Sequence, residues 1–325
     1  MSEHEARGSA ADERGLMVLV ARRYYVDDIS KVQIAQDLGL SRFKVARLLE
    51  QARSTGVVTI TIDADGLVDA ELSARVCRHL GLDAAVVVEA SGDENAVRRQ
   101  VGEAAARLLG ETLHAGEVLG LAWGRTLTAM SAAMPPLPRV DVVQLTGAIG
   151  GDVEESPVEI IRRVALRSGG SARPIFAPLV VDDPRTAQAL RRQPDVAAAL
   201  RMFDSVTTAV VSVGSWDPPN SQLLRTISED ERAHLLQVGV RAEVASLLVS
   251  DEGELVAPDF QDRCVTIGFE QMRAIPRKIA AAGGAPKARA VAAIVRAGLC
   301  TELVTDRALA EALLQLPALA STTAS

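Results

Sequence analysis

The side chains best suited to chemistry in this 325-residue sequence are the basic and polar residues between positions 41 and 50. An arginine can donate two hydrogen bonds to the edge of a guanine, so Arg42 and Arg47 are candidates for contacts to DNA bases. Ser41 and Lys44 suit contacts to phosphates, and Phe43 suits packing on a thymine methyl group. The alternatives are a solvated basic helix face and a helix that contacts only protein.

A second group of polar residues follows the apolar run GLAW at residues 120–123. Gly124 allows a tight turn there, and Arg125 and Thr126 begin a predicted helix. Backbone N–H groups at a helix start, together with an arginine and a hydroxyl group, can bind an anion. A plain tight turn without a ligand is the alternative interpretation.

Lys287 is a further candidate for this anion site, because it stands in the first turn of a helix predicted after the sequence AAGG. Lysine is unfavourable at that end of a helix dipole unless an anion is bound, although a solvated surface lysine is the alternative. We expect Lys287, Arg125 and Thr126 to converge on one anionic group. Thr146 and Gly147 follow another predicted strand and would lie beside the site if the two strands are neighbours.

The basic stretch requires helices to position it, and the sequence predicts three. The first spans residues 14–26, with one face made of Leu16, Leu19, Val20 and Arg23. Ser30 begins the second helix in a capping box with Gln33, and Gly39 ends it in a left-handed turn.

The third helix is capped by Ser41 and runs to about Arg53. Its apolar spacing directs four residues inward, namely Val45, Leu48, Leu49 and Ala52. The basic residues then face outward. Two helices joined at a tight turn are typical of a helix-turn-helix, and the alternating run at 57–62 would form the wing of a winged variant.

Beyond residue 65 the pattern changes to apolar strands that alternate with helices. Runs without polar alternation, each followed by a helix, predict a parallel sheet covered on both faces and therefore an α/β fold. In such a sheet ligands bind beyond the carboxyl ends of the strands, where the candidate anion-binding residues lie. The predicted strands are residues 84–90, 117–123, 140–147, 207–215, 263–268, 277–284 and 299–306, and the clearest helices are 95–113 and 157–168.

Length and composition predict a cytosolic protein of two domains. No apolar run is long enough to span a membrane, and the polar N-terminus is not a signal peptide. The three cysteines lack metal-ligand spacing, so no metal site is expected, and the cysteines are interpreted as buried apolar residues. We expect an N-terminal arm (1–13), a helix-turn-helix domain (14–62), an effector and oligomerisation domain (63–314) and a tail (315–325).

Charge is unevenly distributed along the chain. The net charge is −7, but residues 22–53 carry seven lysines or arginines against four acidic residues. A small basic segment on an acidic body is typical of one DNA-reading module carried by a larger domain. An architectural DNA-binding protein would need a more basic surface overall.

Several motifs in register resemble the SorC family of bacterial sugar-responsive regulators. They are the segment ISKVQIAQDLGLSRFKVARLLEQARSTGVVTITI and, further on, GLAWGRTL, VVQLTG, VVSVGSW and the stretch from RAIPRKIAAAGG to LVTD. The resemblance covers about Leu16 to Leu313. It implies an effector domain similar to the fold of glucosamine-6-phosphate deaminase, ribose-5-phosphate isomerase and CoA-transferases. It also implies a sugar, polyol or phosphosugar ligand and assembly as a tetramer or dimer.

The same resemblance brings further residues to the effector site. Glu243 matches the family's effector-site glutamate, and Glu243 and Asp259 could accept hydrogen bonds from sugar hydroxyls or be unpaired surface carboxylates. Trp123 and Trp216 could each stack on a sugar or belong to the core, and Gln144 could point either way. Arg241 replaces a small residue of the family pattern, which could alter the pocket.

We therefore expect a transcriptional regulator that binds double-stranded operator DNA, is not an enzyme and needs no cofactor. A sugar, polyol or sugar phosphate would control its affinity for DNA. The alternative is a sugar-phosphate isomerase or deaminase with an appended DNA-binding domain, since fold does not fix function. No cluster of histidine and carboxylate suited to general base catalysis is apparent, which favours the regulator.

Overall fold

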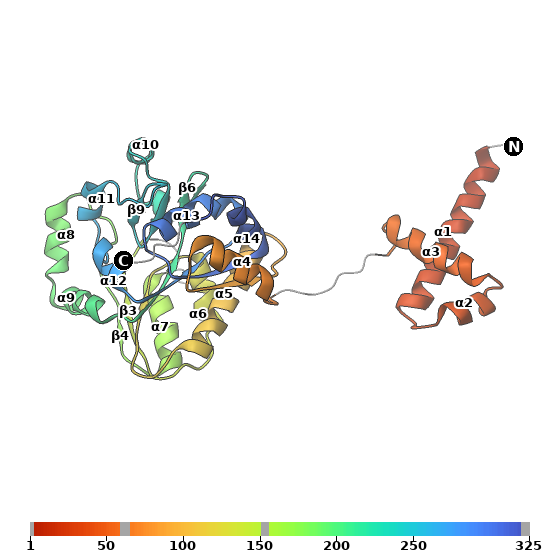
Figure 1. Ribbon diagram of the computed structural model, residues 1–325, viewed down its shortest axis with the longest axis horizontal. Helices are drawn as coiled ribbons and strands as arrows, with labels where there is room; N and C mark the ends of the chain where they lie inside the picture. Colours follow the sequence, from red (N-terminus) through yellow and green to blue (C-terminus); the bar gives the residue numbers. More distant parts are fainter. Residues whose placement is uncertain (1–2, 59–65, 151–155, 320–325) are drawn as a thin grey trace. The chain divides into compact units, whose positions relative to one another are not determined.

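The structure, a computed structural model, describes residues 3–58, 66–150 and 156–319. Contacts within the chain divide it into two units, Met1–Asp63 and Ala64–Ser325 (Figure 1). Each unit has its own cluster of buried apolar side chains. The two units are described separately below.

The described part of the N-terminal unit consists of α1 (Glu3–Tyr25), α2 (Lys31–Asp37) and α3 (Arg42–Ser54). Helix α1 begins at Glu3, so residues 3–13 continue the first helix instead of forming the separate arm that we predicted. This stretch contains three alanines and three glutamates, which favour helix. The predicted wing at 57–62 lies mostly outside the described residues, and Val57 and Val58 pack against the core of this unit.

The buried face of α1 differs from the prediction. Val20 is fully buried, but Leu19 is 42% exposed. Leu16 packs against the core as predicted, and Met17 and Tyr24 pack there in place of Leu19. The buried face is thus shifted toward Met17, Ala21 and Tyr24, because α1 packs against both α2 and α3.

Capping fixes both short helices at the predicted residues. The Ser30 hydroxyl accepts a hydrogen bond from the Gln33 backbone N–H at 3.2 Å, and Gly39 adopts a φ of 63° after α2. The expected capping box also needs a hydrogen bond from the Gln33 side chain back to the Ser30 backbone. Here the Gln33 side chain instead donates to Asp37 at 2.8 Å. At the start of α3, the Ser41 hydroxyl accepts from the Lys44 N–H at 3.1 Å.

The second unit, Ala64–Ser325, which we call the effector unit after the predicted effector domain, is built on a parallel sheet. Within the described residues seven strands pair in the order β1 (Ala84–Val88), β11 (Glu302–Asp306), β10 (Arg277–Ala281), β5 (Thr208–Ser212), β2 (Val118–Leu121), β3 (Asp141–Gln144) and β4 (Ala172–Arg173). Every pairing in this sheet is parallel. The predicted α/β class is confirmed.

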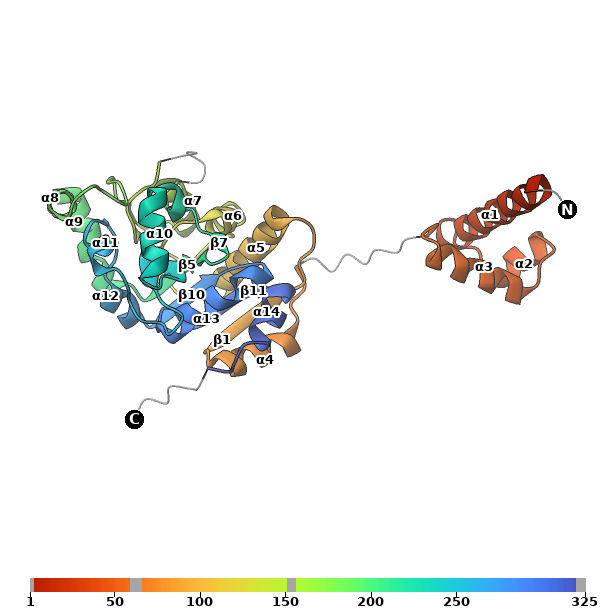
Figure 2. The same cartoon turned by 90° about the horizontal axis from the view of Figure 1, so that it is seen from above.

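Helices cover the sheet in two groups (Figure 2). Helix α5 (Glu94–Thr112) packs on α6 (Arg125–Ala132), which packs on α7 (Pro157–Ser168). Helices α4 (Ala70–Leu80) and α13 (Ala288–Arg296) both pack on α14 (Arg307–Leu314). Right-handed crossovers place helices on opposite faces when the strand order runs in opposite directions, as it does on the two sides of β5. The remaining helices are α8 (Pro184–Arg191), α9 (Pro194–Arg201), α10 (Glu229–Gln237), α11 (Pro258–Asp262) and α12 (Phe269–Ala274).

A second, antiparallel sheet was not predicted. Its strands pair in the order β7 (Pro219–Asn220), β6 (Gly214–Trp216), β8 (Ala242–Val244) and β9 (Leu247–Val249). Strand β6 follows β5 after one residue, so this small sheet begins at the carboxyl end of the large one. Residues 263–268, predicted as a strand, join neither sheet and make only isolated bridges, because their partners Thr146 and Val180 lie in loops.

No helix among the described residues is long and apolar enough to cross a membrane.

Candidate effector site and recognition helix

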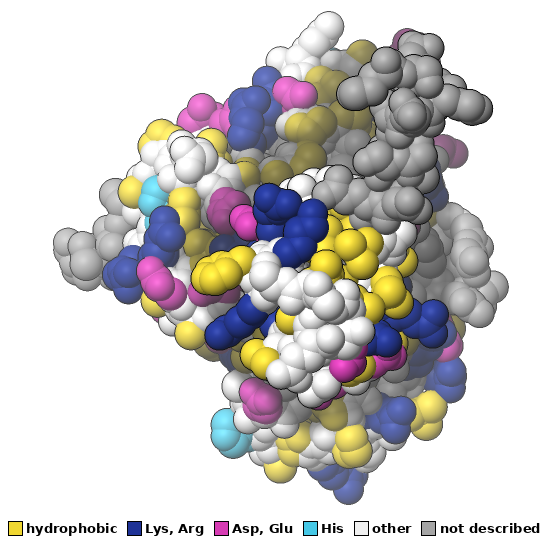
Figure 3. Space-filling view, turned by 90° about the vertical axis from the view of Figure 1, so that its right-hand side faces the viewer, with side chains coloured by type: hydrophobic (Ala, Val, Ile, Leu, Met, Phe, Trp, Pro, Cys, Tyr) yellow, Lys and Arg dark blue, Asp and Glu magenta, His cyan; other side chains and the backbone are white. Residues whose placement is uncertain are grey.

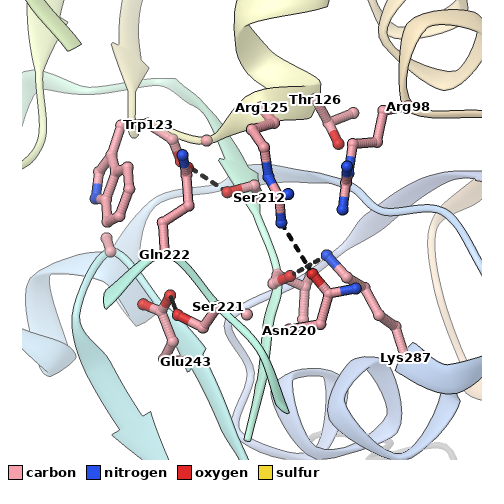
Figure 4. Close-up of a pocket in the computed structure, with 14 residues that line it drawn as sticks. Arg98, Trp123, Arg125, Thr126, Ser212, Asn220, Ser221, Gln222, Glu243 and Lys287 are labelled. Atoms are coloured by element: carbon pink, nitrogen blue, oxygen red, sulfur yellow. Dashed lines mark hydrogen bonds between the residues drawn. The ribbon is translucent and has the colours of Figure 1, made fainter. Parts of the chain in front are cut away.

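A pocket opens where β2, β5 and the small sheet meet, at the carboxyl ends of the parallel strands (Figure 4). It encloses about 410 Å³ of empty space, counting its open mouth. We call it the strand-end pocket. Five of the predicted effector residues line it, namely Gly124, Arg125, Thr126, Glu243 and Lys287.

Three predicted residues do not line the strand-end pocket. Thr146 is fully buried and bridges Thr266, and the Gly147 N–H donates to the Val265 carbonyl at 2.6 Å. The segment at 264–267 thus covers the end of β3 and closes it to ligands. Asp259 is exposed on α11.

Three cationic side chains stand on one side of the pocket. Lys287 precedes α13 and is 8% exposed, and its Nζ donates to the Val213 carbonyl at 2.7 Å. Arg125 begins α6 and donates to Asn220 Oδ1 at 3.1 Å. Arg98 is 7% exposed on α5, and sequence reasoning missed it.

Burial and repulsion act together on Lys287. The pKa of its ammonium group is lowered to about 8, chiefly by burial and further by the positive charges of Arg98 and Arg125. The negative charges of Glu243 and Glu94 raise the pKa of Lys287. The alternative of a solvated surface lysine is therefore wrong, and a bound anion would offset the repulsion among these cations.

Glu243 stands on the other side of the pocket, at the centre of the short strand β8. It accepts a hydrogen bond from the Ser221 hydroxyl at 2.8 Å and another from the Ser246 N–H at 3.1 Å. Burial raises the pKa of this carboxyl group, although both hydrogen bonds and Lys287 oppose the shift. A carboxyl group held in this way can accept hydrogen bonds from ligand hydroxyls.

The remaining alternatives are decided by burial. Trp216 is 1% exposed and belongs to the core, whereas Trp123 is 7% exposed and lines the pocket. Gln144 is an internal residue, because it donates to the Thr146 carbonyl and accepts from the Ile175 N–H. Arg241 lies outside the pocket beside Asp251, so this departure from the family pattern leaves the lining unchanged.

Besides Arg98, most of the polar lining residues that sequence reasoning missed come from one hairpin. Asn220, Ser221 and Gln222 follow β6 and line the pocket opposite α6 (Figure 4). Ser212, at the end of β5, donates to the Trp123 carbonyl at 2.6 Å and packs against Gly124. None of the described histidines, cysteines or acidic residues form a group of three that could hold a metal ion.

Gly214 should be sensitive to substitution, because a Cβ atom there would lie 2.4 Å from Glu243 Oε1. We expect Gly214→Ala to displace this carboxylate and to lower the free energy of unfolding by roughly 1–3 kcal/mol, as overpacking does. Chemical denaturation measures this. Gly150→Ala is the control, since nothing lies within 4 Å of its Cβ position. Equal stability of the two variants would contradict the packing described for Glu243.

The outward face of α3 carries the other predicted residues. Ser41, Arg42, Phe43 and Arg47 are exposed, Phe43 by 88%, and Lys44 is partly buried. The four residues predicted to point inward, Val45, Leu48, Leu49 and Ala52, are all buried. The near surface of the N-terminal unit shows lysine and arginine side chains among hydrophobic ones (Figure 3).

Fold and pocket together define the class as a sensor of small ligands joined to a separate helical unit. Comparisons with known proteins give the family. Residues 67–315 match the Sugar-bind family, described as "Putative sugar-binding domain". The chain belongs to this family, and the resemblance to SorC-type transcriptional regulators is confirmed.

Relatives and solved structures agree with this assignment. The uncharacterized transcriptional regulator YjhU of Escherichia coli is 28% identical, covering 90% of this chain and 92% of its own. The deoxyribonucleoside regulator of Bacillus subtilis is 27% identical, covering 93% and 98%. The structure of the full-length sorbitol operon regulator SorC from Klebsiella pneumoniae superposes with a TM-score of 0.71 at 25% identity, covering 94% and 99%. These relatives are regulators, so the enzyme alternative is not favoured.

Proposed function

We propose that the protein binds operator DNA through α3 and that a sugar, polyol or sugar phosphate in the strand-end pocket controls this binding. The observation that carries the proposal is the composition of the pocket inside the family's sugar-binding domain. Three cations lie on one side of the pocket and a buried, hydrogen-bonded carboxyl group lies on the other (Figure 4).

The two sides suit the two ends of a phosphosugar. Arg98, Arg125 and Lys287, with the uncapped N–H groups at the start of α6, would bind an anionic group. Glu243 and Ser221 would bind hydroxyl groups. A neutral sugar or polyol would bind only on the side of Glu243 and Ser221.

The N-terminal unit would act as a helix-turn-helix. One recognition helix buries too little DNA for tight and selective binding, since single modules cover only about 600–1,000 Å². We therefore propose a homodimer or homotetramer on a palindromic operator whose half-sites are about one helical turn apart or a multiple of it. The effector unit, as the larger of the two, would provide the assembly surface.

The experiment begins with selection of the preferred DNA site from a randomised library. Thermal-shift screening against sugars, polyols and their phosphates then identifies a ligand. Affinity for the selected site should change by roughly 5-fold to 150-fold when that ligand is bound. The proposal fails if no sequence preference is found, or if a confirmed ligand leaves the affinity for DNA unchanged.

The residues on α3 make separate contributions. Arg47→Ala should weaken binding to the selected site by roughly 1–3 kcal/mol and relax the preference at one base pair. Lys44→Ala should instead weaken binding to all sequences and reduce the salt dependence. Titration of labelled duplexes at several salt concentrations distinguishes these effects. Arg53→Ala, in the last turn of α3, is the control, and an unchanged base preference in Arg47→Ala would contradict the assignment.

Anion binding should depend on pH. Lys287 is protonated below its pKa of about 8 and loses its charge above it, so the affinity for an anion should fall as the pH rises through 8. A bound anion raises this pKa, so binding takes up protons, and the affinity can fall by up to roughly tenfold per pH unit. Titration calorimetry with sulfate tests this, because the charge of sulfate is constant over the range. A flat profile would show that Lys287 does not contact the anion.

A further inference from the structure

Glu94 stands beside the cations of the strand-end pocket but does not line it. It occupies the first turn of α5, directly after the N-cap residue Asp93. Its Oε1 atom accepts hydrogen bonds from the Arg98 guanidinium and from Asn220 Nδ2, the latter at 2.8 Å. The same Asn220 side chain accepts from Arg125, so Glu94 is linked directly to Arg98 and, through this amide group, to Arg125.

Glu94 is the exposed negative charge of this site, whereas Glu243 is a buried one. The Glu94 side chain is 56% exposed, and an ion pair with this exposure is weak and easily exchanged. Glu243 is 6% exposed and is held by two hydrogen bonds. The hydrogen bond from Asn220, followed by the charges of Arg98, Arg125 and Lys287, lowers the pKa of Glu94, so this carboxyl group stays ionised in their field.

The position of Glu94 has a consequence for ligand binding. Arg98 directs its guanidinium at Glu94 and is itself nearly buried, so its hydrogen-bonding capacity is already used in part. An anion that enters the strand-end pocket must share Arg98 and Asn220 with the carboxylate, and it is repelled by the charge of that carboxylate. The carboxylate balances the charge of these cations, as the ligand's anionic group would.

We propose that Glu94 is an internal counter-ion that the anionic group of the effector replaces, and that it sets the affinity and charge preference of the pocket. This role rests on the proposed function, because it presumes an anion beside Arg98, Arg125 and Lys287. Replacement of Glu94 by the ligand would also change a contact between two parts of the fold. The Glu94–Asn220 hydrogen bond ties α5 of the large sheet to β7 of the small sheet, and replacement of Glu94 releases that tie.

The test is the affinity of the full-length protein for inorganic phosphate, measured by titration calorimetry in the wild type and in Glu94→Gln. Glutamine keeps the side-chain oxygen that accepts from Asn220 and removes only the charge. We expect phosphate to bind Glu94→Gln roughly twofold to fivefold more tightly, the range of a partly exposed ion pair. Glu111→Gln is the matched control, since Glu111 is exposed near the other end of the same helix.

A purely structural role of Glu94 predicts no gain in phosphate affinity. If Glu94 only stabilises the start of α5, Glu94→Gln lowers the melting temperature and binds phosphate no better than the wild type, which overturns the proposal. If the wild type binds phosphate and Glu94→Gln binds it equally or more weakly, the counter-ion role is wrong but the anion site stands. If neither binds phosphate, the anion site itself fails. Binding by Glu94→Gln alone supports the proposal, because the native carboxylate then excludes the ion.

Discussion

Lys287→Met is expected to remove most of the affinity for an anionic effector while making the ligand-free protein more stable. The ammonium group would donate a charged hydrogen bond to the anion, and its loss should weaken binding roughly 10-fold to 150-fold. Methionine has similar length and no charge to bury. The substitution thus separates ligand binding from stability.

The gain in stability follows from the pKa. Its decrease from 10.5 to about 8 means that the folded protein holds this proton less well than the unfolded chain, at a cost of about 3 kcal/mol below pH 8. Loss of the hydrogen bond to the Val213 carbonyl destabilises the variant by about 1 kcal/mol, which offsets part of this gain. At pH 7 the free energy of unfolding of Lys287→Met should therefore be about 2 kcal/mol higher than that of the wild type.

The direction of this difference in stability can be checked by changing the pH. In the wild type the unfolded chain binds the extra proton between pH 8 and 10.5, so the Lys287 contribution to the free energy of unfolding rises across that interval. In Lys287→Met this contribution is absent, so the difference in stability between the two proteins should shrink toward high pH. Denaturation at several pH values measures this difference.

Lys278→Met provides the control. Lys278 is also buried and its pKa is also lowered, chiefly by burial, but its Nζ donates to the carbonyls of Arg273 and Ile275 at the end of α12, away from the pocket. We expect this variant to bind phosphate like the wild type. Equal loss of phosphate affinity in both variants would show that the effect of Lys287 is general and does not arise from contact with the anion.

The strand-end residues were predictable because their signals are local. Gly124, Arg125 and Thr126 follow a strand and begin a helix, and Lys287 follows another strand, so the rule that ligands bind at carboxyl ends was enough to group them. Arg98 lies within α5, and its only signal is that it shares a helix face with the buried Val101 and Ala105.

The parts of the site that were not predicted depend on contacts between segments far apart in the sequence. Thr146 also follows a strand, but the segment that covers it is more than a hundred residues later in the chain, and nothing in either segment identifies the other. The small antiparallel sheet likewise joins residues 214–220 to residues 242–249, in strands too short to give a clear pattern. The lining residues Asn220 and Ser221 depend on that sheet and were missed with it.

The second large effect concerns the core of the N-terminal unit. Leu48 is fully buried among few other residues, namely Val20, Ala21, Ile34, Ala35, Val45, Leu49 and Ala52. Leu48→Ala should cost about 2–5 kcal/mol, and a unit of 63 residues has only a few kcal/mol of stability to lose. We expect this unit to be largely unfolded at 37 °C.

The expected result is a loss of operator binding of at least about tenfold, compounded because an operator with two half-sites needs two folded units. Phosphate affinity should not change, since the effector unit has a core of its own. Leu19→Ala, at a 42% exposed leucine of the same unit, should have little effect on either measurement. Calorimetry of Leu48→Ala should show one transition lost or lowered and the other unchanged. A single transition that shifts as a whole, or a parallel loss of phosphate binding, would mean that the two units do not fold independently.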